Sequence, residues 1–422
     1  MTDKMAARLG LQSAAATQDY VMGVAERSLH SASVGTIMNR SEQYREILKQ
    51  PAAASDDGDG NEPESKVKPY DLAVIIGRFE PMHVGHGILI NKARTLADNT
   101  LVLIGSAKLP RTIKNPFTYE ERREMIEGYV DQHDFTHVDV AALRDSLYSD
   151  AWWEKQVQEL VQKHILALAA DGGIVTGRPI KVCVVGYKKD DTSYYLDRFP
   201  QWDLKQVEEI SLPLDATTIR NLLFTSPNYL ELLNGIVPDS TLVFLKQFVK
   251  TEEYQRLVRE FIKINADKAS WAIAPHPVNF DTADAVVTKA GHILLVKRDK
   301  APGEGLWALP GGFVNPWETV RAAAMRELDE ETCIDLPPAI LNSAFAQEGF
   351  YFDHPGRSLR GRTITFAFKV DLDTYDKKPG LPKVHGSDDA REARWFTIAE
   401  VLEMSEFIFE DHLSIISRLL GL

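Results

Sequence analysis

The sequence predicts two α/β domains, a parallel sheet with helices on both of its faces followed by a smaller α/β/α module. Three observations support this fold class. Between residues 70 and about 264, short apolar segments alternate with helical segments, which is typical of parallel sheets. After about residue 280, apolar strands surround one long helical segment at 320–332. A chain of 422 residues is also too long for a single core.

The expected elements follow in chain order. The first domain, expected at 68–268, should contain strands at 72–76, 100–104 and 181–186, helices from about His86 and Ala216, and a helical stretch at 229–264. Pro275 and Pro277 indicate a linker at 269–280. The second domain, expected at 281–422, should contain strands at 285–287, 292–296 and 363–370, the helix at 320–332, and a final helix at about 398–420. Residues 1–67 are polar and are expected to form a largely disordered or loosely helical extension.

Composition and charge argue against several classes of protein. The chain is 44% hydrophobic and 26% charged, which is ordinary for a globular protein, and no apolar run is long enough to predict a membrane span. The N-terminus lacks the pattern of a signal peptide. The two cysteines, Cys183 and Cys333, fall in different predicted domains, which favours a reduced, cytoplasmic protein. A net charge of −13 argues against a nucleic-acid partner.

The predicted helix at 320–332 carries a cluster of carboxylates. Glu327, Glu330 and Glu331 stand at i, i+3 and i+4 and therefore share one face of the helix. Like charges placed so closely repel unless cations lie among them, and oxygen ligands of this kind suit Mg²⁺ or Mn²⁺. The alternative is a solvated acidic face, which is common on surface helices.

The residues before these glutamates weaken that alternative. Gly312 is followed after five residues by Glu318 and after seven more by Arg326, directly before the first glutamate. In this register the segment resembles the Nudix box of metal-dependent diphosphate hydrolases. The family commonly has Gly where this chain has Trp317 and normally has Gly at Cys333. Such a glycine ends the helix with positive φ, which Cys adopts at a cost, so the departure concerns the turn and not the carboxylates.

A second candidate site follows the strand at 72–76. Gly77 and Gly85 let the backbone approach a phosphate closely, and the start of the next helix offers free N–H groups and the positive end of a dipole. His83 and His86 are candidates for donating hydrogen bonds to phosphoryl oxygens as negative charge develops. A pair of histidines at this spacing is more often structural.

Two motifs shift the balance towards function. The histidine segment resembles the His-x-Gly-His signature of nucleotidyltransferases, and the segment from Thr217 to Arg220 resembles their second phosphate motif, Ser/Thr-x-x-Arg. The second motif places a hydroxyl and a guanidinium at another helix start. Asp215 stands where that superfamily often has Ser, so one expected hydroxyl contact is not supplied.

Further segments narrow the resemblance. One family shares both the order of the two domains and four segments of this chain, residues 77–86, 105–108, 111–118 and 186–190. Over about 69–422 the chain resembles the bifunctional nicotinamide mononucleotide adenylyltransferase/Nudix hydrolases of bacteria. The resemblance implies a Rossmann-like nucleotidyltransferase domain followed by a Nudix domain.

For the first domain, the resemblance implies transfer of an adenylyl group from ATP to nicotinamide mononucleotide, giving NAD and diphosphate with the aid of Mg²⁺. His83 and His86 would contact the ATP phosphates, with His86 nearest the developing charge, and Thr217 and Arg220 would hold the β and γ groups. The nucleotide groove would be lined at the strand end by Gly77, Arg78 and Phe79.

Two further candidates in this domain have equally plausible structural roles. Lys188 is basic and near a strand end, but it is as easily a solvated surface lysine. Trp153 is expected to stack on the nicotinamide ring, and core packing is an equal alternative for the neighbouring indoles Trp152 and Trp153.

For the second domain, the resemblance implies hydrolysis of a nucleoside diphosphate derivative, with ADP-ribose as the leading substrate, giving AMP and ribose 5-phosphate. Metal ions on Glu327, Glu330 and Glu331 would polarise the diphosphate and activate a water, with Glu327 and Glu331 central to catalysis. Arg326 is expected to brace Glu318 or another carboxylate of the box. The general base is left open among three carboxylates, Glu348, Asp389 and Glu392.

Other interpretations remain. Phe350, Tyr351 and Phe352 form either a base-stacking wall or, more simply, a core or edge strand. The first domain can also act on a pantetheine or cytidine substrate, and the Nudix module can serve as a metabolite sensor. Such sensors commonly lose metal carboxylates, which this chain retains. The sequence leaves the oligomeric state open, including a homo-oligomer.

Overall fold

The structure, a computed structural model, describes residues 67–422 except 176, 189–190 and 208–214. The chain forms two compact units. The first comprises residues up to 107, 114–145 and 149–255, and the second comprises 108–113, 146–148 and 256–422. The extension expected at 1–67 lies outside the described residues apart from Val67, as do Lys189 and Asp190.

The first unit is built on a sheet of five parallel strands in the order β3-β2-β1-β4-β5. The strands are β1 (Tyr70–Gly77), β2 (Ala97–Ile104), β3 (Val138–Ala142), β4 (Val182–Gly186) and β5 (Asp203–Gln206). The central strand β1 is buried along almost its whole length, because helices cover both faces of a parallel sheet. The predicted parallel α/β architecture is confirmed.

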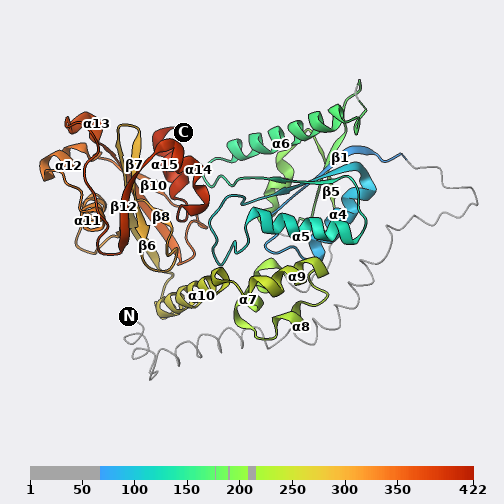
Figure 1. Cartoon of the computed structure of the whole chain (residues 1–422), viewed down its shortest axis with the longest axis horizontal. Coiled ribbons are helices and arrows are strands. Elements are labelled where there is room, and N and C mark those ends of the chain that lie inside the picture. Colours follow the sequence, from blue (N-terminus) through green and yellow to red (C-terminus); the bar gives the residue numbers. More distant parts are fainter. Residues whose placement is uncertain (1–66, 176, 189–190, 208–214) are drawn as a thin grey trace, which may run out of the picture. The chain divides into compact units, whose positions relative to one another are not determined.

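The helices of the first unit are α4 (Val84–Leu96), α5 (Tyr119–Gln132), α6 (Asp150–Ala170), α7 (Ala216–Thr225), α8 (Tyr229–Leu233), α9 (Asp239–Phe248) and the start of α10 (Glu252–Trp271), with a 3₁₀ segment η1 (Asp191–Arg198). Figure 1 shows α6 on one side of the sheet and α4 and α5 on the other. Since all the strands are parallel, the loops after β1, β2 and β3 meet at one edge of the sheet. Helices α4 and α6 begin at this edge.

The second unit contains a mixed sheet in the order β10-β11-β6-β7-β12, with β8 paired to β7 and β9 to β6. The strands are β6 (Asn279–Lys289), β7 (His292–Arg298), β8 (Trp307–Ala308), β9 (Gly311–Phe313), β10 (Phe350–Phe352), β11 (Arg362–Asp371) and β12 (Ala390–Thr397). Strands β6 and β11 are parallel, and the other pairs are antiparallel. The strands predicted at 285–287 and 292–296 belong to β6 and β7, which form an antiparallel hairpin paired through Thr288 and Lys289.

Helices lie on both faces of this sheet. They are α11 (Val320–Thr332), α12 (Pro338–Ala344), α13 (Leu372–Tyr375), α14 (Ile398–Glu403) and α15 (His412–Leu420), with a 3₁₀ turn η2 (Ser405–Phe407). One core contains Ala323 and Leu328 of α11, and a second core contains Ile415 and Ile416 of α15. The α/β/α arrangement expected from the sequence is confirmed.

The single helix predicted at 398–420 is wrong. The chain leaves the helical path after α14 and resumes it at α15, with Glu410 at a φ of 45° between them. The interruption has a packing reason, because Ile408 and Phe409 are buried and Asp411 forms a buried ion pair with Arg357. A continuous helix would not place these side chains in the core.

The connection between the domains is shorter than expected. Helix α10 runs to Trp271 and β6 starts at Asn279, so the segment between them is 272–278 rather than 269–280. The division between the compact units falls inside α10, after Gln255. Among the described residues, no helix is long and apolar enough to cross a membrane.

Candidate functional sites

Helix α11 has the bounds that the sequence predicted, and its two ends have clear causes. The side chain of Thr319 caps the start by accepting a hydrogen bond from the backbone N–H of Ala322. Cys333 ends the helix in the left-handed conformation, with φ of 41° and ψ of 45°. Cysteine therefore occupies the backbone geometry for which glycine is normally used.

The close approach of the preceding loop explains the glycine at the start of the box. A Cβ atom on Gly312 would lie 2.5 Å from Oε1 of Glu327, so any larger residue would displace that carboxylate. The same loop also contacts Glu331: the backbone N–H of Gly311 donates a hydrogen bond of 3.0 Å to its Oε2. The loop and the helix thereby hold two of the carboxylates in fixed positions.

Arg326 braces the other carboxylates, as the sequence indicated. It donates two hydrogen bonds to Glu318, of 2.7 and 3.1 Å. Its Nη1 donates to both Glu327 and Glu330 at 2.8 Å. The Arg326 guanidinium lowers the pKa of Glu318 to about 2, so this carboxylate remains ionised and linked to Arg326.

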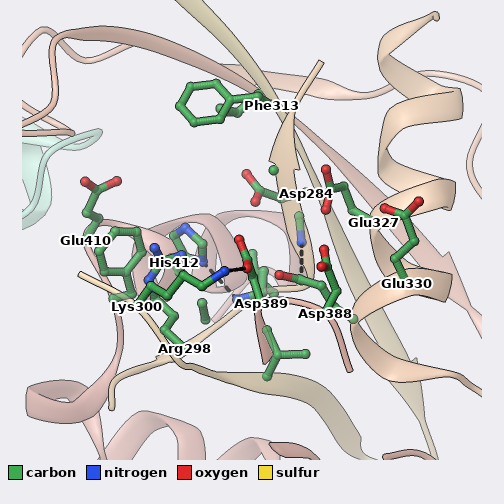
Figure 2. A pocket seen from close by; sticks show the side chains of 18 of the residues that line it. Asp284, Arg298, Lys300, Phe313, Glu327, Glu330, Asp388, Asp389, Glu410 and His412 are labelled. Atoms are coloured by element: carbon green, nitrogen blue, oxygen red, sulfur yellow. Dashed lines mark hydrogen bonds and ion pairs between the residues drawn. The ribbon is translucent and has the colours of Figure 1, made fainter. Parts of the chain in front are cut away.

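The three helix glutamates line one cavity of about 320 Å³ (Figure 2). Other carboxylates also line it: Asp284, Asp388, Asp389 and Glu410. Besides Arg326, basic side chains on the wall are Arg298, Lys300, Arg357 and Arg360, and the neutral ring of His412 also lines the cavity. A cavity with both acidic and basic walls suits a metal ion together with a diphosphate.

Most of these additional residues were missed by sequence reasoning. They come from five separate parts of the second unit, so no local spacing links them. Some signals were present: Asp284 interrupts an apolar strand, and Arg357, Arg360 and Arg362 form a dense arginine run. Arg357 makes two hydrogen bonds, of 2.8 and 3.0 Å, to Asp411.

The donor chemistry of the cavity fits a hard divalent cation. Burial raises the pKa of Glu331 to about 8, and the nearby Glu327 carboxylate adds to this effect. Burial also raises the pKa of Asp284 to about 6 and that of Glu327. A cation would favour the ionised forms. Within the described ranges, no three His, Cys, Asp or Glu side chains are grouped closely enough to hold a metal ion.

The structure separates the three candidates for the general base. Asp389 lines the cavity and forms an ion pair with Lys300. Glu348 and Glu392 are exposed and do not line it. Phe350 and Tyr351 are exposed on β10, an edge strand, so the structure favours the strand interpretation over a stacking wall at this cavity.

In the first unit, the two histidines lie at the start of α4. The Nδ1 atom of His83 accepts a hydrogen bond from the backbone N–H of Gly85, and Nδ1 of His86 accepts one from the N–H of His83, both at 3.2 Å. With both Nδ1 atoms accepting, the neutral rings carry their protons on Nε2. Burial lowers the pKa of His86 well below its usual range, so this ring is a neutral donor near pH 7.

The loop before the histidines is tightly constrained. Phe79 is buried with a φ of 55°, and its ring stacks on His86 with centroids 4.2 Å apart. The buried Arg122 donates to the carbonyl oxygens of Arg78 and Gly105, both at 2.7 Å. Arg122 thus joins the loops that follow β1 and β2, a positioning role that sequence reasoning did not identify.

Arg220 approaches the same loop from α7. Its Nη1 donates to the carbonyl oxygen of Glu80 at 2.7 Å, and its Nη2 donates to Oγ1 of Thr217 at 3.1 Å. Asp215 caps α7 by accepting from the N–H of Thr218 at 2.8 Å. The substitution of Asp for the family's Ser therefore serves the helix start.

Positive charge gathers around this loop. Burial lowers the pKa of Arg220 to about 10. Burial and the neighbouring charge of Arg78 lower the pKa of Lys114. Lys114 was not singled out from the sequence, although it lies in the 111–118 segment. A cluster of cations next to two ring N–H donors is suited to binding phosphate groups.

Two sequence candidates have structural partners. The Trp153 ring packs against the core, and its centroid lies 6.0 Å from that of the Phe199 ring, which matches the core-packing alternative. Trp152 is 47% exposed in the first turn of α6, at the carboxyl edge of the sheet. Lys188 forms an exposed ion pair of 2.7 Å with Asp197. Trp152 is therefore the better candidate for stacking on a ligand ring.

Comparisons with known proteins find a match for each of the two units. Residues 279–419 match the model of the NUDIX domain family, and residues 74–175 match the Cytidylyltransferase-like family. The chain is 31% identical over 192 residues to a nicotinamide/nicotinic acid mononucleotide adenylyltransferase from Acinetobacter baylyi, covering 46% of this chain and 94% of the relative. It is 32% identical over 162 residues to an ADP-ribose pyrophosphatase from Methanocaldococcus jannaschii, covering 38% of this chain and 86% of the relative.

A solved structure spans both units. The crystal structure of a bifunctional NMN adenylyltransferase/ADP ribose pyrophosphatase from Francisella tularensis matches with a TM-score of 0.73 and 34% identity, covering 83% of this chain and 99% of that one. A second structure of the Francisella tularensis enzyme, complexed with AMP and a Mn ion, matches with a TM-score of 0.72. The chain belongs to the family of bifunctional NMN adenylyltransferase/ADP-ribose pyrophosphatases.

Proposed function

We propose that the first unit transfers the adenylyl group of ATP to nicotinamide mononucleotide, releasing diphosphate and forming NAD. The observation that carries this proposal is the pair of neutral histidines at the start of α4, next to Arg220 and Lys114. In this reaction a phosphate oxygen of nicotinamide mononucleotide attacks the α-phosphorus of ATP. The bond from that phosphorus to the bridging oxygen breaks, and diphosphate leaves.

Positioning and charge neutralisation account for this chemistry, because no protein nucleophile is needed. The Nε2–H groups of His83 and His86 donate to the phosphoryl oxygens as charge develops on them. Arg220, Lys114 and Arg78 balance the charge of the triphosphate. Gly77 and Phe79 shape the groove, and Thr217 supports Arg220 through its hydroxyl.

We propose that the second unit hydrolyses ADP-ribose to AMP and ribose 5-phosphate. The cavity formed by Glu327, Glu330 and Glu331 and walled by arginines supports this proposal. A bound Mg²⁺, or Mn²⁺ in its place, would polarise the diphosphate and lower the pKa of a water. Arg298 and Arg360 would neutralise the diphosphate, and Asp389, which lines the cavity, would accept a proton from the attacking water.

The test is direct. The purified chain should form NAD from ATP and nicotinamide mononucleotide with Mg²⁺, and should release AMP and ribose 5-phosphate from ADP-ribose in a separate assay. A panel of other nucleoside diphosphates should be hydrolysed more slowly. If neither activity is found, the proposal is wrong, and a preference for another diphosphate would overturn the proposed hydrolase substrate.

A further inference from the structure

His412, the first residue of α15, lies in the wall of the hydrolase cavity. Only 6% of its surface is exposed, so the ring is held by the surrounding protein. Its Nδ1 atom accepts a hydrogen bond of 2.9 Å from the backbone N–H of Leu309. This contact turns Nδ1 towards the main chain and leaves Nε2 on the other side of the ring.

The His412 ring is neutral and carries its proton on Nε2. Burial lowers the pKa of His412 well below its usual range, and three nearby arginines add to this effect. These are Arg357, Arg298 and Arg360. A neutral imidazole has one N–H donor and one acceptor, and the Leu309 contact uses the acceptor. Nε2 is therefore a hydrogen-bond donor near pH 7.

This donor faces the cavity without a protein partner. Within the part of the chain that the structure describes, no group accepts a hydrogen bond from Nε2 of His412. Solvent still reaches Nε2, because this atom is not one of the fully buried side-chain atoms left without a partner. Figure 2 shows His412 beside Arg298 on one side of the cavity, with Glu327 and Glu330 on the other. A ligand in the cavity can therefore supply the missing acceptor.

Packing around Phe409 holds this donor together with two arginines. The rings of Phe409 and His412 meet edge to face, with centroids 5.5 Å apart. The guanidinium carbon of Arg298 lies 4.2 Å from the centroid of the Phe409 ring, and that of Arg360 lies 5.9 Å from it. All four side chains line the cavity. Two cations and one neutral donor around a buried ring suit an anion with several oxygen atoms.

We infer that His412 is a catalytic residue of the hydrolase, which donates a hydrogen bond from Nε2 to a phosphate oxygen of ADP-ribose. This inference rests on the proposed hydrolase function. The diphosphate would lie between the helix glutamates and the wall that contains His412. When the water oxygen bonds to phosphorus and the bond to the bridging oxygen breaks, negative charge shifts among the phosphate oxygens. A fixed neutral donor stabilises that charge without adding another buried cation.

Two amide variants separate the two nitrogens of the ring. In His412→Asn, the amide oxygen can replace Nδ1 and accept from Leu309, but no donor reaches the position of Nε2. In His412→Gln, the longer side chain places an amide N–H near that position, and the Leu309 contact is lost. The kcat/KM for ADP-ribose should fall about tenfold or more in His412→Asn, the scale of one hydrogen bond to a charged group. It should fall by less than about threefold in His412→Gln.

Controls show whether the variants are folded. NAD synthesis and a melting curve would be measured on the same preparations, and the rate of NAD synthesis should be unchanged in both. His292, at the start of β7, does not line the cavity, so His292→Asn should leave hydrolysis unchanged.

The order of the two variants decides the inference. A greater loss in His412→Gln than in His412→Asn would show that the ring serves only to hold Leu309. That result, equal losses in both variants, or full activity of His412→Asn would overturn the inference. If His412→Asn does not fold, a folded His412→Gln with near wild-type activity would support the donor, and a loss of about tenfold or more would overturn it.

Failure of the proposed function would be visible separately. If the wild-type chain does not hydrolyse ADP-ribose, that function is wrong. Binding of ADP-ribose would then be measured by calorimetry with Mn²⁺ in the same variants. An affinity about tenfold weaker in His412→Asn, and near the wild-type value in His412→Gln, would still support a contact between His412 and the diphosphate. Equal affinities in the two variants would exclude it.

Discussion

Burial and the nearby Glu327 carboxylate disfavour the ionised form of Glu331 and outweigh the hydrogen bond from the Gly311 N–H, which favours it. Replacement by Gln keeps the shape and removes the charge. Hydrolysis of ADP-ribose should fall by about 10² or more, because activation of a metal-bound water depends on such carboxylates. Added Mn²⁺ should restore part of the activity.

NAD synthesis by the same variant provides the control. The chemistry of that reaction lies in the first unit, so its rate should be unchanged by Glu331→Gln. Both activities would be assayed on one preparation. Equal loss of both, or unchanged hydrolysis, would contradict the assignment of separate sites.

The raised pKa of Glu331 also predicts a pH effect on stability. Burial raises the pKa of Glu331 to about 8 in the folded protein, whereas the unfolded chain releases this proton near pH 4.5. Between these values the folded state binds more protons, so the free energy of unfolding decreases as the pH rises. Melting curves in a chelator from pH 5 to 8.5 should show a decline for the wild type that is smaller in Glu331→Gln. A parallel decline in both proteins would count against this linkage.

His86 provides the corresponding test in the first unit. His86→Ala removes a neutral donor whose proton is held on Nε2 by the His83 N–H contact. The kcat for NAD formation should fall by about 10² or more, the scale for loss of one transition-state donor, with smaller changes in KM. Steady-state assays would measure this, and near-full turnover would show that the motif assignment is wrong. ADP-ribose hydrolysis should stay at the wild-type level.

At the scale of one element, α11 carries a local cost at its C-terminal end. Cys333 has a φ of 41°, and a non-glycine residue in this region is less stable by roughly 1–2 kcal/mol. Cys333→Gly should therefore raise the free energy of unfolding by about 0.5–1 kcal/mol, after allowing for the greater freedom of glycine in the unfolded chain. Thermal or denaturant unfolding would measure this gain.

Cys333→Ser is the matched control for that prediction. Serine retains the Cβ atom and hence the steric cost, so it should bring no comparable gain. Hydrolysis should be retained in both variants, because the carboxylates lie on the preceding turns of α11. Equal stabilisation by Ser and Gly would show that the thiol, and not the backbone, is responsible.

At the scale of the whole molecule, the position of α10 bears on where the hydrolase domain begins. Most of this helix belongs to the second unit, and the buried Glu260 accepts a hydrogen bond of 3.2 Å from the N–H of Gly303. A fragment of residues 256–422 should therefore melt at a higher temperature than one of 281–422. If removal of α10 costs the shorter fragment roughly 1–2 kcal/mol of stability, its melting temperature should fall by several degrees. Equal melting temperatures would place the boundary near 281, as the sequence suggested.

The first domain offers the complementary experiment. We expect a fragment of residues 66–268 to fold and to form NAD, because the parallel sheet has its own core. NAD formation would be compared with that of the full chain. An inactive or insoluble fragment beside an active full chain would show that the transferase depends on the second unit.

The sequence by itself determined the features whose causes are local or periodic. The alternation of apolar and helical segments predicted the parallel sheet, and the composition of residues 320–332 predicted the bounds of α11. Only the tertiary structure placed Asp284, Arg298 and Glu410 around the box carboxylates, since these residues are far apart in the chain. It also packed Trp153 against the core, left Trp152 exposed, and split the final helix, because burial against distant strands is not encoded in local spacing.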